Sequence, residues 1–259
     1  MNNLELKKII DPLLDTFLKA GKLAKEISYR GVKITIKSDN TPVTDGDLAV
    51  DKLIRDKISS LTANVSIISE ETVDLKKQNS NKNFWLVDPI DGTKEYIKKK
   101  SEYTLNAALI INSKPAAGIV YAPEKDRLFF SYGLGNAFEI RNKVKTTLDC
   151  KKKTELDKVF ALSYSEELPD DILKIHKKYK VSSFIKMSSS LKFCVIAAGE
   201  SDLYVARARA REWDIAAGHS ILIHAGGTVT NFEGEEFSYG KKDYKNPALI
   251  AKRGENLHN

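Results

Sequence analysis

Cysteine is scarce in this chain: Cys150 and Cys194 are its two cysteines among 259 residues, and no Cys-x-x-Cys motif occurs. Two cysteines exclude the disulfide framework that holds many small secreted domains together. Histidine is scarce too, and His219 and His224, five residues apart, form no metal-binding set with the cysteines. We therefore expect a protein of a reducing compartment, without a metal site of the cysteine–histidine kind.

A long hydrophobic run is also missing from the N-terminal region. Residues 1–22 carry Asp11, Asp15 and several lysines among their apolar residues. Such a segment is neither a signal peptide nor a membrane-spanning helix. We expect a cytoplasmic protein with no transmembrane segment, at most peripheral to the inner membrane.

Positive charge is in excess. Forty-two lysine and arginine residues against 35 acidic residues give a net charge of +7, and the pI is near 9.1. This charge fits a nucleic-acid binder, a site that attracts anionic substrates, or simply a lysine-rich solvated surface. No RNA-binding motif with interleaved aromatic residues accompanies the lysines, so we expect no specific nucleic-acid partner.

Hydrophobic periodicity predicts a mixed α/β (α+β) fold. Apolar residues recur at helical spacing over residues 4–27 and 48–61, whereas residues 104–140 contain several β-like runs separated by turns. Strand-like and helix-like segments alternate in the second half of the chain. We expect a single domain over residues 1–259, with an N-terminal α+β half of about 1–145 and a C-terminal α/β half of about 146–259.

Acidic side chains stand at the ends of several of these predicted elements. Glu70 follows an apolar strand, Asp88 and Asp91 flank a proline at the end of another, and Asp47 and Asp214 open helices. Taken singly, each has a plain structural explanation as a turn, a solvated strand end or a helix cap. Taken together they could converge at the crevice where ligands of α/β sheets usually bind.

Converging carboxylates repel one another unless a cation lies among them. Oxygen ligands suit hard cations, and Mg²⁺ first among these. The DPIDGT segment can present the Asp88 carboxylate, the Ile90 carbonyl and the Asp91 carboxylate to one side. Gly92 allows the backbone to approach an anion closely, and the amides of Gly92 and Thr93 at a helix start could bind a phosphate.

These residues lie in motifs that resemble a known family. WLVDPIDGT (85–93) and WDIAAG (213–218) resemble the two signatures of the inositol monophosphatase superfamily. TPVTDGD (41–47) and SEE (69–71) precede the first signature, and SSSLKFC (188–194) lies between the two, in the order that the superfamily has. The resemblance therefore covers nearly the whole chain. It implies a layered αβαβα sandwich in which N-terminal helices lie on a mostly antiparallel sheet and a smaller C-terminal sheet follows. The active site is implied where the two halves meet.

The resemblance also implies roles for the acids. Two or three Mg²⁺ ions would be held by Glu70, Asp88, the Ile90 carbonyl, Asp91 and Asp214. Thr93 and Asp47 would orient and deprotonate the attacking water, with Glu70 beside it. Clustered magnesium ions lower the pKa of a bound water and neutralise the attacking and leaving oxygens, which agrees with this set of residues.

Within the superfamily, the run Lys94-Glu95-Tyr96 and the segments SSLKFC and EWDIAAGH resemble the bacterial 3′(2′),5′-bisphosphate nucleotidases. This implies hydrolysis of the 3′-phosphate of adenosine 3′,5′-bisphosphate, and of its sulfated relative, by a monomer or homodimer whose partner is a small phosphonucleotide. Arg209 matches the pattern of these enzymes, whereas Arg207 and Arg211 depart from it. The implied substrate-binding residues are Gly92, Thr93, Lys94, Ser189, Ser190, Lys192, Arg209 and Asp214.

Two alternatives stay open. An inositol monophosphatase or a broad sugar-phosphate phosphatase would use the same metal centre. A non-catalytic basic protein that binds nucleotides or nucleic acid is the alternative from another class; it would bind with a steep salt dependence and without turnover. An anion binder has no use for several converging acids, which favours an enzyme.

Overall fold

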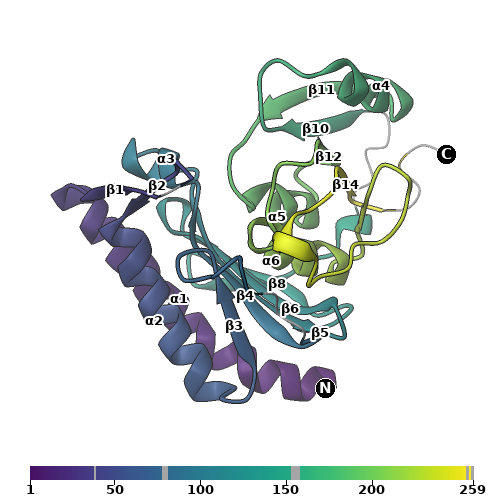
Figure 1. Ribbon diagram of the computed structural model, residues 1–259. Helices are drawn as coiled ribbons and strands as arrows, with labels where there is room; N and C mark the ends of the chain where they lie inside the picture. The colour runs from purple at the N-terminus through teal and green to yellow at the C-terminus, as the bar shows by residue number, and fades with distance from the viewer. Residues whose placement is uncertain (38, 78–80, 153–157, 255–256, 258–259) are drawn as a thin grey trace.

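The computed structural model describes residues 1–259 except 38, 78–80, 153–157, 255–256 and 258–259. Helices and sheets alternate in layers (Figure 1). The helices are α1 (Asn3–Arg30), α2 (Asp45–Leu61), α3 (Thr93–Ile97), α4 (Asp170–Lys178), α5 (Leu191–Ala197) and α6 (Glu212–His224). Among the described residues, no helix is both long and apolar enough to cross a lipid bilayer.

A seven-stranded sheet forms the first β-layer, with strand order β3-β4-β5-β6-β7-β8-β9. β3 and β4 are parallel, and the remaining neighbours are antiparallel. The strands are β3 (Ser66–Ser69), β4 (Phe84–Asp91), β5 (Thr104–Ile111), β6 (Lys114–Ala122), β7 (Arg127–Ser131), β8 (Ala137–Arg141) and β9 (Val144–Thr147). The predicted antiparallel run over 104–140 is confirmed, while β9 lies beyond it and was not predicted.

A five-stranded sheet forms the second β-layer, with strand order β11-β10-β12-β14-β13. Here β10 is parallel to both of its neighbours, and β14 is antiparallel to β12 and β13. The strands are β10 (Val159–Ser163), β11 (Val181–Lys186), β12 (Leu203–Ala206), β13 (Thr228–Thr230) and β14 (Leu249–Lys252). A separate hairpin joins β1 (Ile34–Ile36) to β2 (Pro42–Thr44).

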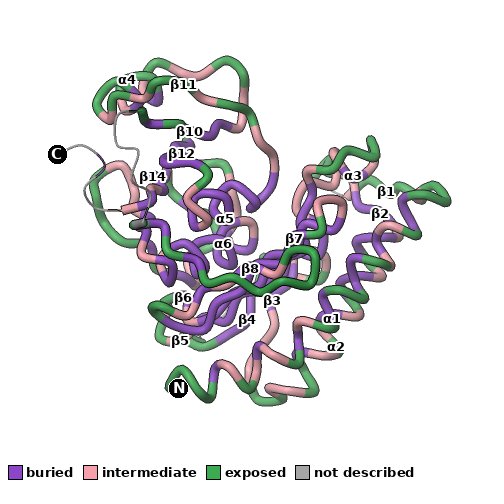
Figure 2. The backbone as a smooth tube through the Cα atoms, turned by 180° about the vertical axis from the view of Figure 1, so that it is seen from behind, coloured by how far each residue is buried: buried purple, intermediate pink, exposed green. Residues whose placement is uncertain are grey.

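Along β4, successive side chains point to opposite faces of the sheet and pack in different layers. On β4, Trp85 and Val87 pack in one hydrophobic cluster with residues of α1 and α2, whereas Phe84 and Leu86 pack in another with residues of α5 and α6. The five-stranded sheet repeats this division, since its other face packs with Ile172 of α4. Figure 2 shows the resulting buried interior between exposed outer turns. The order of layers is therefore α, β, α, β, α, as the resemblance implied.

The end of β4 differs from the prediction. The sequence placed the end of this strand at the proline between Asp88 and Asp91, but β4 continues to Asp91. Its pairing with β5 shifts register between Asp88, opposite Asn106, and Asp91, opposite Thr104. The proline lies in this irregular stretch, where a missing N–H is tolerated. The strand thus carries two acids at an irregularity rather than one acid before a loop.

Candidate active site

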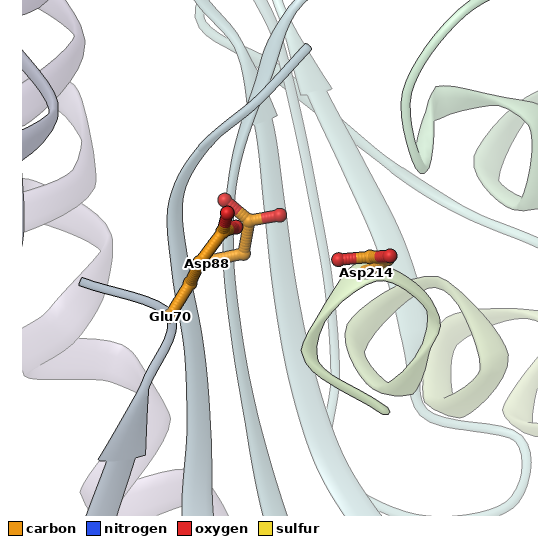
Figure 3. A group of neighbouring side chains, drawn as sticks. All are labelled: Glu70, Asp88 and Asp214. Atoms are coloured by element: carbon orange, nitrogen blue, oxygen red, sulfur yellow. The ribbon is translucent and has the colours of Figure 1, made fainter. Parts of the chain in front are cut away.

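Three carboxylates from separate elements meet at the edge of the seven-stranded sheet. One oxygen of each of Glu70, Asp88 and Asp214 lies within 4.8 Å of the others. Glu70 follows β3, Asp88 is part of β4, and Asp214 lies in the first turn of α6. Figure 3 shows the side chains of Glu70 and Asp88 on one side and Asp214 reaching toward them from the helix. The predicted convergence of these three acids is confirmed.

Burial makes this cluster electrostatically unfavourable without a cation. Asp88 is 2% exposed, and burial, followed by the negative charges of Glu70, Asp91 and Asp214, raises its pKa well above the ordinary value. Burial and the charges of Asp91 and Glu70 do the same for the pKa of Asp214. The Oδ1 atom of Asp88 is buried and has no hydrogen-bond partner among the described residues. An all-oxygen set of this kind fits a hard divalent cation.

Asp91 lies beside the cluster and connects it to α5. Its Oδ2 atom accepts a hydrogen bond from the Ser190 amide at 2.5 Å. Burial raises the pKa of Asp91 to about 6, although the charge of Lys192 and the Ser190 hydrogen bond oppose the shift. Asp91 therefore adds negative charge to the same region, while one of its oxygens already has a partner.

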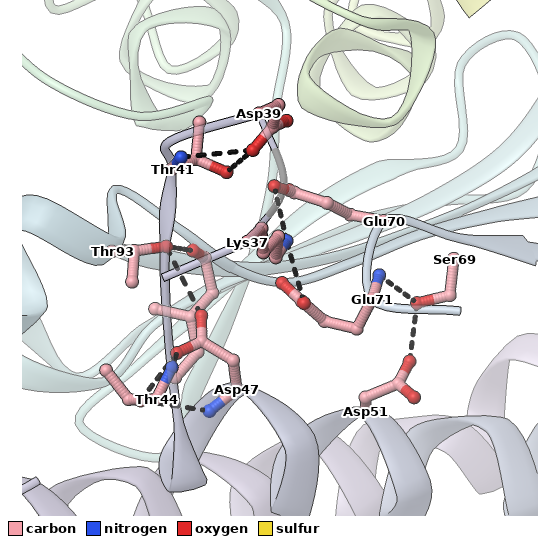
Figure 4. A network of polar contacts seen from close by, with 11 residues as sticks. Lys37, Asp39, Thr41, Thr44, Asp47, Asp51, Ser69, Glu70, Glu71 and Thr93 are labelled. Carbon is pink, nitrogen blue, oxygen red and sulfur yellow. Dashed lines mark hydrogen bonds and ion pairs between the residues drawn. The ribbon is translucent and has the colours of Figure 1, made fainter. Parts of the chain in front are cut away.

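Asp47, Thr93 and the Ile90 carbonyl form a second polar group, and Figure 4 shows Thr93 next to Asp47. The hydroxyl of Thr93 lies 3.3 Å from Asp47 Oδ1 and 3.2 Å from the Ile90 carbonyl oxygen. Thr44, the N-cap of α2, holds Asp47 by donating to Oδ2 from its amide at 2.8 Å and from its hydroxyl at 2.5 Å. Burial raises the pKa of Asp47. A hydroxyl between a carboxylate and a carbonyl is suited to holding a water molecule or passing on its proton.

Sequence reasoning assigned no role at this site to two charged residues, Lys37 and Glu71. Lys37 Nζ lies 3.4 Å from Glu70 Oε1 and 2.8 Å from Glu71 Oε2, and Figure 4 shows it between the two glutamates. Burial raises the pKa of Glu71 to about 7. Glu71 follows Glu70 directly, so the pair was visible in the sequence. Nothing in the sequence, however, placed the lysine of the β1–β2 hairpin against it.

A cavity of about 400 Å³ opens next to the carboxylates. Its acidic wall includes Asp91 and Asp214, and its lining carries five cationic side chains: Lys94, Lys186, Lys192, Arg207 and Arg209. Gly92 lies in its wall and has φ of 96°, a left-handed conformation that disfavours any other residue. The cavity is thus bordered by acidic residues that suit a metal ion and by cationic residues that suit a phosphate.

The predicted substrate-binding residues divide into two groups. Ser189, Lys192 and Arg209 line the cavity, as do Gly92, Lys94 and Asp214. Thr93 and Ser190 are described residues that do not line it, and the Ser190 hydroxyl donates to Asn106 Oδ1 at 2.7 Å instead. Lys192 is buried, donates from Nζ to the Ser189 carbonyl at 2.5 Å, and has its pKa lowered by burial to about 8. Lys192 is thus a buried cation at the cavity and not an exposed residue on the surface of α5.

Three comparisons with known proteins agree with this geometry. A family model described as the inositol monophosphatase family matches residues 5–259. The 3′(2′),5′-bisphosphate nucleotidase CysQ of Buchnera aphidicola is 35% identical over 239 residues, which are 90% of this chain and 88% of that protein. The nucleotidase CysQ of Escherichia coli K12 is 32% identical over 246 residues, 93% of this chain and 98% of that protein.

The fold agrees with solved structures as well. A crystal structure of CysQ from Bacteroides thetaiotaomicron, described as a bacterial member of the inositol monophosphatase family, superposes with a TM-score of 0.76. It is 30% identical, and the match covers 93% of this chain and 96% of that one. The family-model match, the identity to these relatives and the shared fold lead to one conclusion: the chain belongs to the inositol monophosphatase family.

Proposed function

We propose that the protein is a Mg²⁺-dependent phosphomonoesterase that hydrolyses the 3′-phosphate of adenosine 3′,5′-bisphosphate, and of its sulfated relative, to leave the 5′-phosphorylated nucleotide and phosphate. The relatives that match over most of the chain are named as 3′(2′),5′-bisphosphate nucleotidases. The observation that carries the proposal is the buried cluster of Glu70, Asp88 and Asp214 at a cavity with a cationic wall. A cluster for cations beside a wall for anions is what phosphate-ester cleavage requires.

The proposed ligands for two or three Mg²⁺ ions are Glu70, Asp88, the Ile90 carbonyl, Asp91 and Asp214. When bound, the ions would lower the pKa of a water molecule and neutralise charge on the phosphate and the leaving oxygen. Support comes from the metal dependence general in this family and from the unpartnered, buried Asp88 oxygen. The oxygen-only donor set excludes a preference for soft metals.

The proposed work of the protein side chains is to place the water and take up its proton. Thr93 would hold the water through its hydroxyl, and Asp47 would receive the proton through Thr93, with Glu70 on the other side of the water. The oxygen of the water forms a bond to phosphorus as the bond between phosphorus and the 3′-oxygen breaks; the released 3′-oxygen takes a proton from solvent water, and Asp47 returns its own proton to solvent. The 3.3 Å contact between Thr93 and Asp47 supports this relay.

The proposed substrate contacts are divided between the turn after β4 and the cationic wall. Gly92, Thr93 and Lys94 would bind the phosphate that is cleaved, together with Ser189 and Lys192. Ser190 would not contact the phosphate; its backbone amide would hold Asp91 in place through a hydrogen bond. Arg209 would meet the remainder of the nucleotide.

We also propose that residues 1–259 act as one cytoplasmic domain. Glu70 and Asp88 come from the N-terminal half and Asp214 from the C-terminal half, so neither half holds the cluster alone. Cys150 and Cys194 are both buried free thiols, which supports a reducing compartment.

A substrate panel tests the proposal. Phosphate release is measured from adenosine 3′,5′-bisphosphate, its sulfated relative, inositol 1-phosphate and fructose 1,6-bisphosphate, each with Mg²⁺ and with EDTA. We expect the highest kcat/KM for the bisphosphonucleotides and no release in EDTA. A higher kcat/KM for inositol 1-phosphate than for the bisphosphonucleotides would indicate an inositol monophosphatase instead. Salt-sensitive nucleotide binding without any release would indicate the non-catalytic alternative.

A further inference from the structure

Arg209 differs in its surroundings from Arg207, the other arginine of the cavity. Its guanidinium carbon lies 4.6 Å from the ring centre of Tyr164. Within the part of the chain that the structure describes, Arg209 has no ion pair with an acid. Arg207, two residues earlier, donates to both carboxylate oxygens of Asp171 at 2.8–3.1 Å. Of the two arginines that line the cavity, one is therefore neutralised and the other is held by an aromatic ring.

The position of Tyr164 explains how the ring reaches Arg209. Tyr164 directly follows β10, and Arg209 lies in the segment that joins β12 to α6. β10 and β12 are neighbouring parallel strands, so both residues follow carboxyl ends at one edge of the sheet. Both side chains line the cavity that Asp91 and Asp214 border. Tyr164 and Arg209 thus line the same cavity as the acids proposed to bind metal, but they follow strands of the five-stranded sheet.

An arginine stacked on an aromatic ring keeps N–H groups available for a second partner, because the stacking uses the face of the guanidinium and phosphate binding uses its edge. Stacking also removes part of the rotamer freedom that a long side chain otherwise loses on binding a ligand. The partner that fits an unpaired guanidinium in such a cavity is a phosphate. The phosphate to be cleaved must lie at the carboxylate cluster, and among the described residues Arg209 forms no ion pair with those carboxylates.

We propose that Tyr164 is a positioning residue that holds Arg209 for the second phosphate of the substrate, the one that is not cleaved. The inference rests on the proposed function and deepens it. The pair then sets the preference for a bisphosphonucleotide over a monophosphate ester. Tyr164 contributes through Arg209 and makes no contact of its own with the reacting atoms.

The test compares two substrates that differ only in the second phosphate. We define selectivity as kcat/KM for adenosine 3′,5′-bisphosphate divided by kcat/KM for adenosine 3′-monophosphate. Arg209→Gln is expected to lower selectivity about 10- to 100-fold, the range for losing a charged hydrogen-bonded pair. Tyr164→Leu is expected to lower it about two- to fivefold, the range for an exposed cation–π contact. Tyr164→Phe keeps the ring and should retain wild-type selectivity.

The double variant separates positioning from direct contact. In the Arg209→Gln background, Tyr164→Leu should cause no further loss of selectivity, because the residue that it positions is absent. Arg207→Gln is the matched control: it removes the same charge from the same cavity wall, but from an arginine already paired with Asp171, and it should leave selectivity unchanged. Circular dichroism and thermal unfolding show for every variant that the protein has folded.

Three results would overturn the inference while leaving the proposed function intact. Selectivity could be unchanged in Arg209→Gln, it could fall equally in Arg207→Gln, or Tyr164→Leu could lower it as much with Arg209 absent as with Arg209 present. If wild-type protein released no 3′-phosphate from the bisphosphate at all, the proposed function would fail and the inference would fail with it. The two failures are therefore distinguishable on wild-type protein alone.

Discussion

Asp88 is buried among other carboxyl groups, and one of its oxygens has no partner among the described residues. Replacing Asp88 with Asn removes one negative charge and supplies an amide that can donate to Glu70 or Asp214. We expect Asp88→Asn to abolish phosphate release and to raise the melting temperature of metal-free protein, because the repulsion in the cluster decreases. Thermal unfolding in EDTA, together with a phosphate-release assay, measures both effects. A fully active variant would remove Asp88 from the mechanism.

Asp91 makes the stability of the metal-free protein depend on pH. An unfolded aspartate has a pKa near 3.9, whereas burial raises the pKa of Asp91 to about 6. The folded metal-free protein therefore holds this proton at higher pH than the unfolded chain. The stability that the proton contributes is fully present below about pH 4 and is lost as the pH rises through 6.

Divalent cations should reverse this loss, since they bind the ionised carboxylates. We expect the increase in melting temperature caused by Mg²⁺, measured against EDTA at each pH, to grow between pH 5 and pH 8. The difference between Mg²⁺ and EDTA at each pH removes the contribution to the melting temperature of groups remote from the site. His219 and His224, whose pKa values burial lowers, are such groups. An increase that is the same at pH 5 and pH 8 would contradict the proposed role of these carboxylates.

Sequence reasoning identified single residues when their chemistry was local. The acids at the ends of elements were predicted because their residue type and position are visible along the chain. The contacts of Lys37 with Glu70 and Glu71, and of Tyr164 with Arg209, were not predicted. Each joins segments far apart in the sequence, and a lone lysine or tyrosine has no motif that names its partner.

At the scale of elements, the N-terminus of α2 sets the orientation of Asp47. The Thr44 hydroxyl accepts from the amides of Gly46 and Asp47 and donates to the Asp47 carboxylate. Thr44→Ala should lower stability by about 0.5–2 kcal/mol, the usual cost of a lost N-cap. It should also lower kcat by about tenfold, because a hydrogen bond to a charged group is lost. Thr44→Ser keeps the hydroxyl and is the control; equal losses in both variants would show that the cap does not act through this oxygen.

The contact between α6 and β6 positions Asp214 in a similar way. A Cβ atom on Gly118 of β6 would lie 2.7 Å from the Ala217 carbonyl of α6 and 3.0 Å from Ser220 Cβ. Gly118→Ala should therefore push the helix away from the sheet, lower stability by about 1–3 kcal/mol and weaken the stabilisation by Mg²⁺. Gly254→Ala meets no atom within 4 Å and is the matched control. Wild-type stability and Mg²⁺ response in Gly118→Ala would contradict this account of the helix position.

Elements with a strong period were predictable, and irregular ones were not. The amphipathic helix predicted over residues 4–27 corresponds to α1, and the antiparallel strands over 104–140 correspond to β5 to β8. The continuation of β4 through Pro89 was not predicted, because local preference favours ending a strand there and the pairing with β5 overrides it. β9 is exposed along its whole length, so it lacks the apolar alternation that would reveal it.

At the scale of the whole molecule, the layers explain why the site needs both sheets. β3 and β4 bring Glu70 and Asp88 to one edge of the seven-stranded sheet, and α6, packed on that sheet, brings Asp214 to the same point. Periodicity predicted a mixed fold, but the order of layers came from the family resemblance. Pairing of strands far apart in sequence, such as β10 with β12, leaves no local pattern from which the layers could be derived.

The most direct test is a crystal structure with Mn²⁺, a divalent cation whose anomalous scattering locates it. We expect anomalous density between the carboxylates of Glu70, Asp88 and Asp214, with Asp91 adjacent. Crystals soaked in Mn²⁺ that showed these carboxylates well ordered and no density among them would contradict the claim that acids from separate elements assemble to share divalent ions.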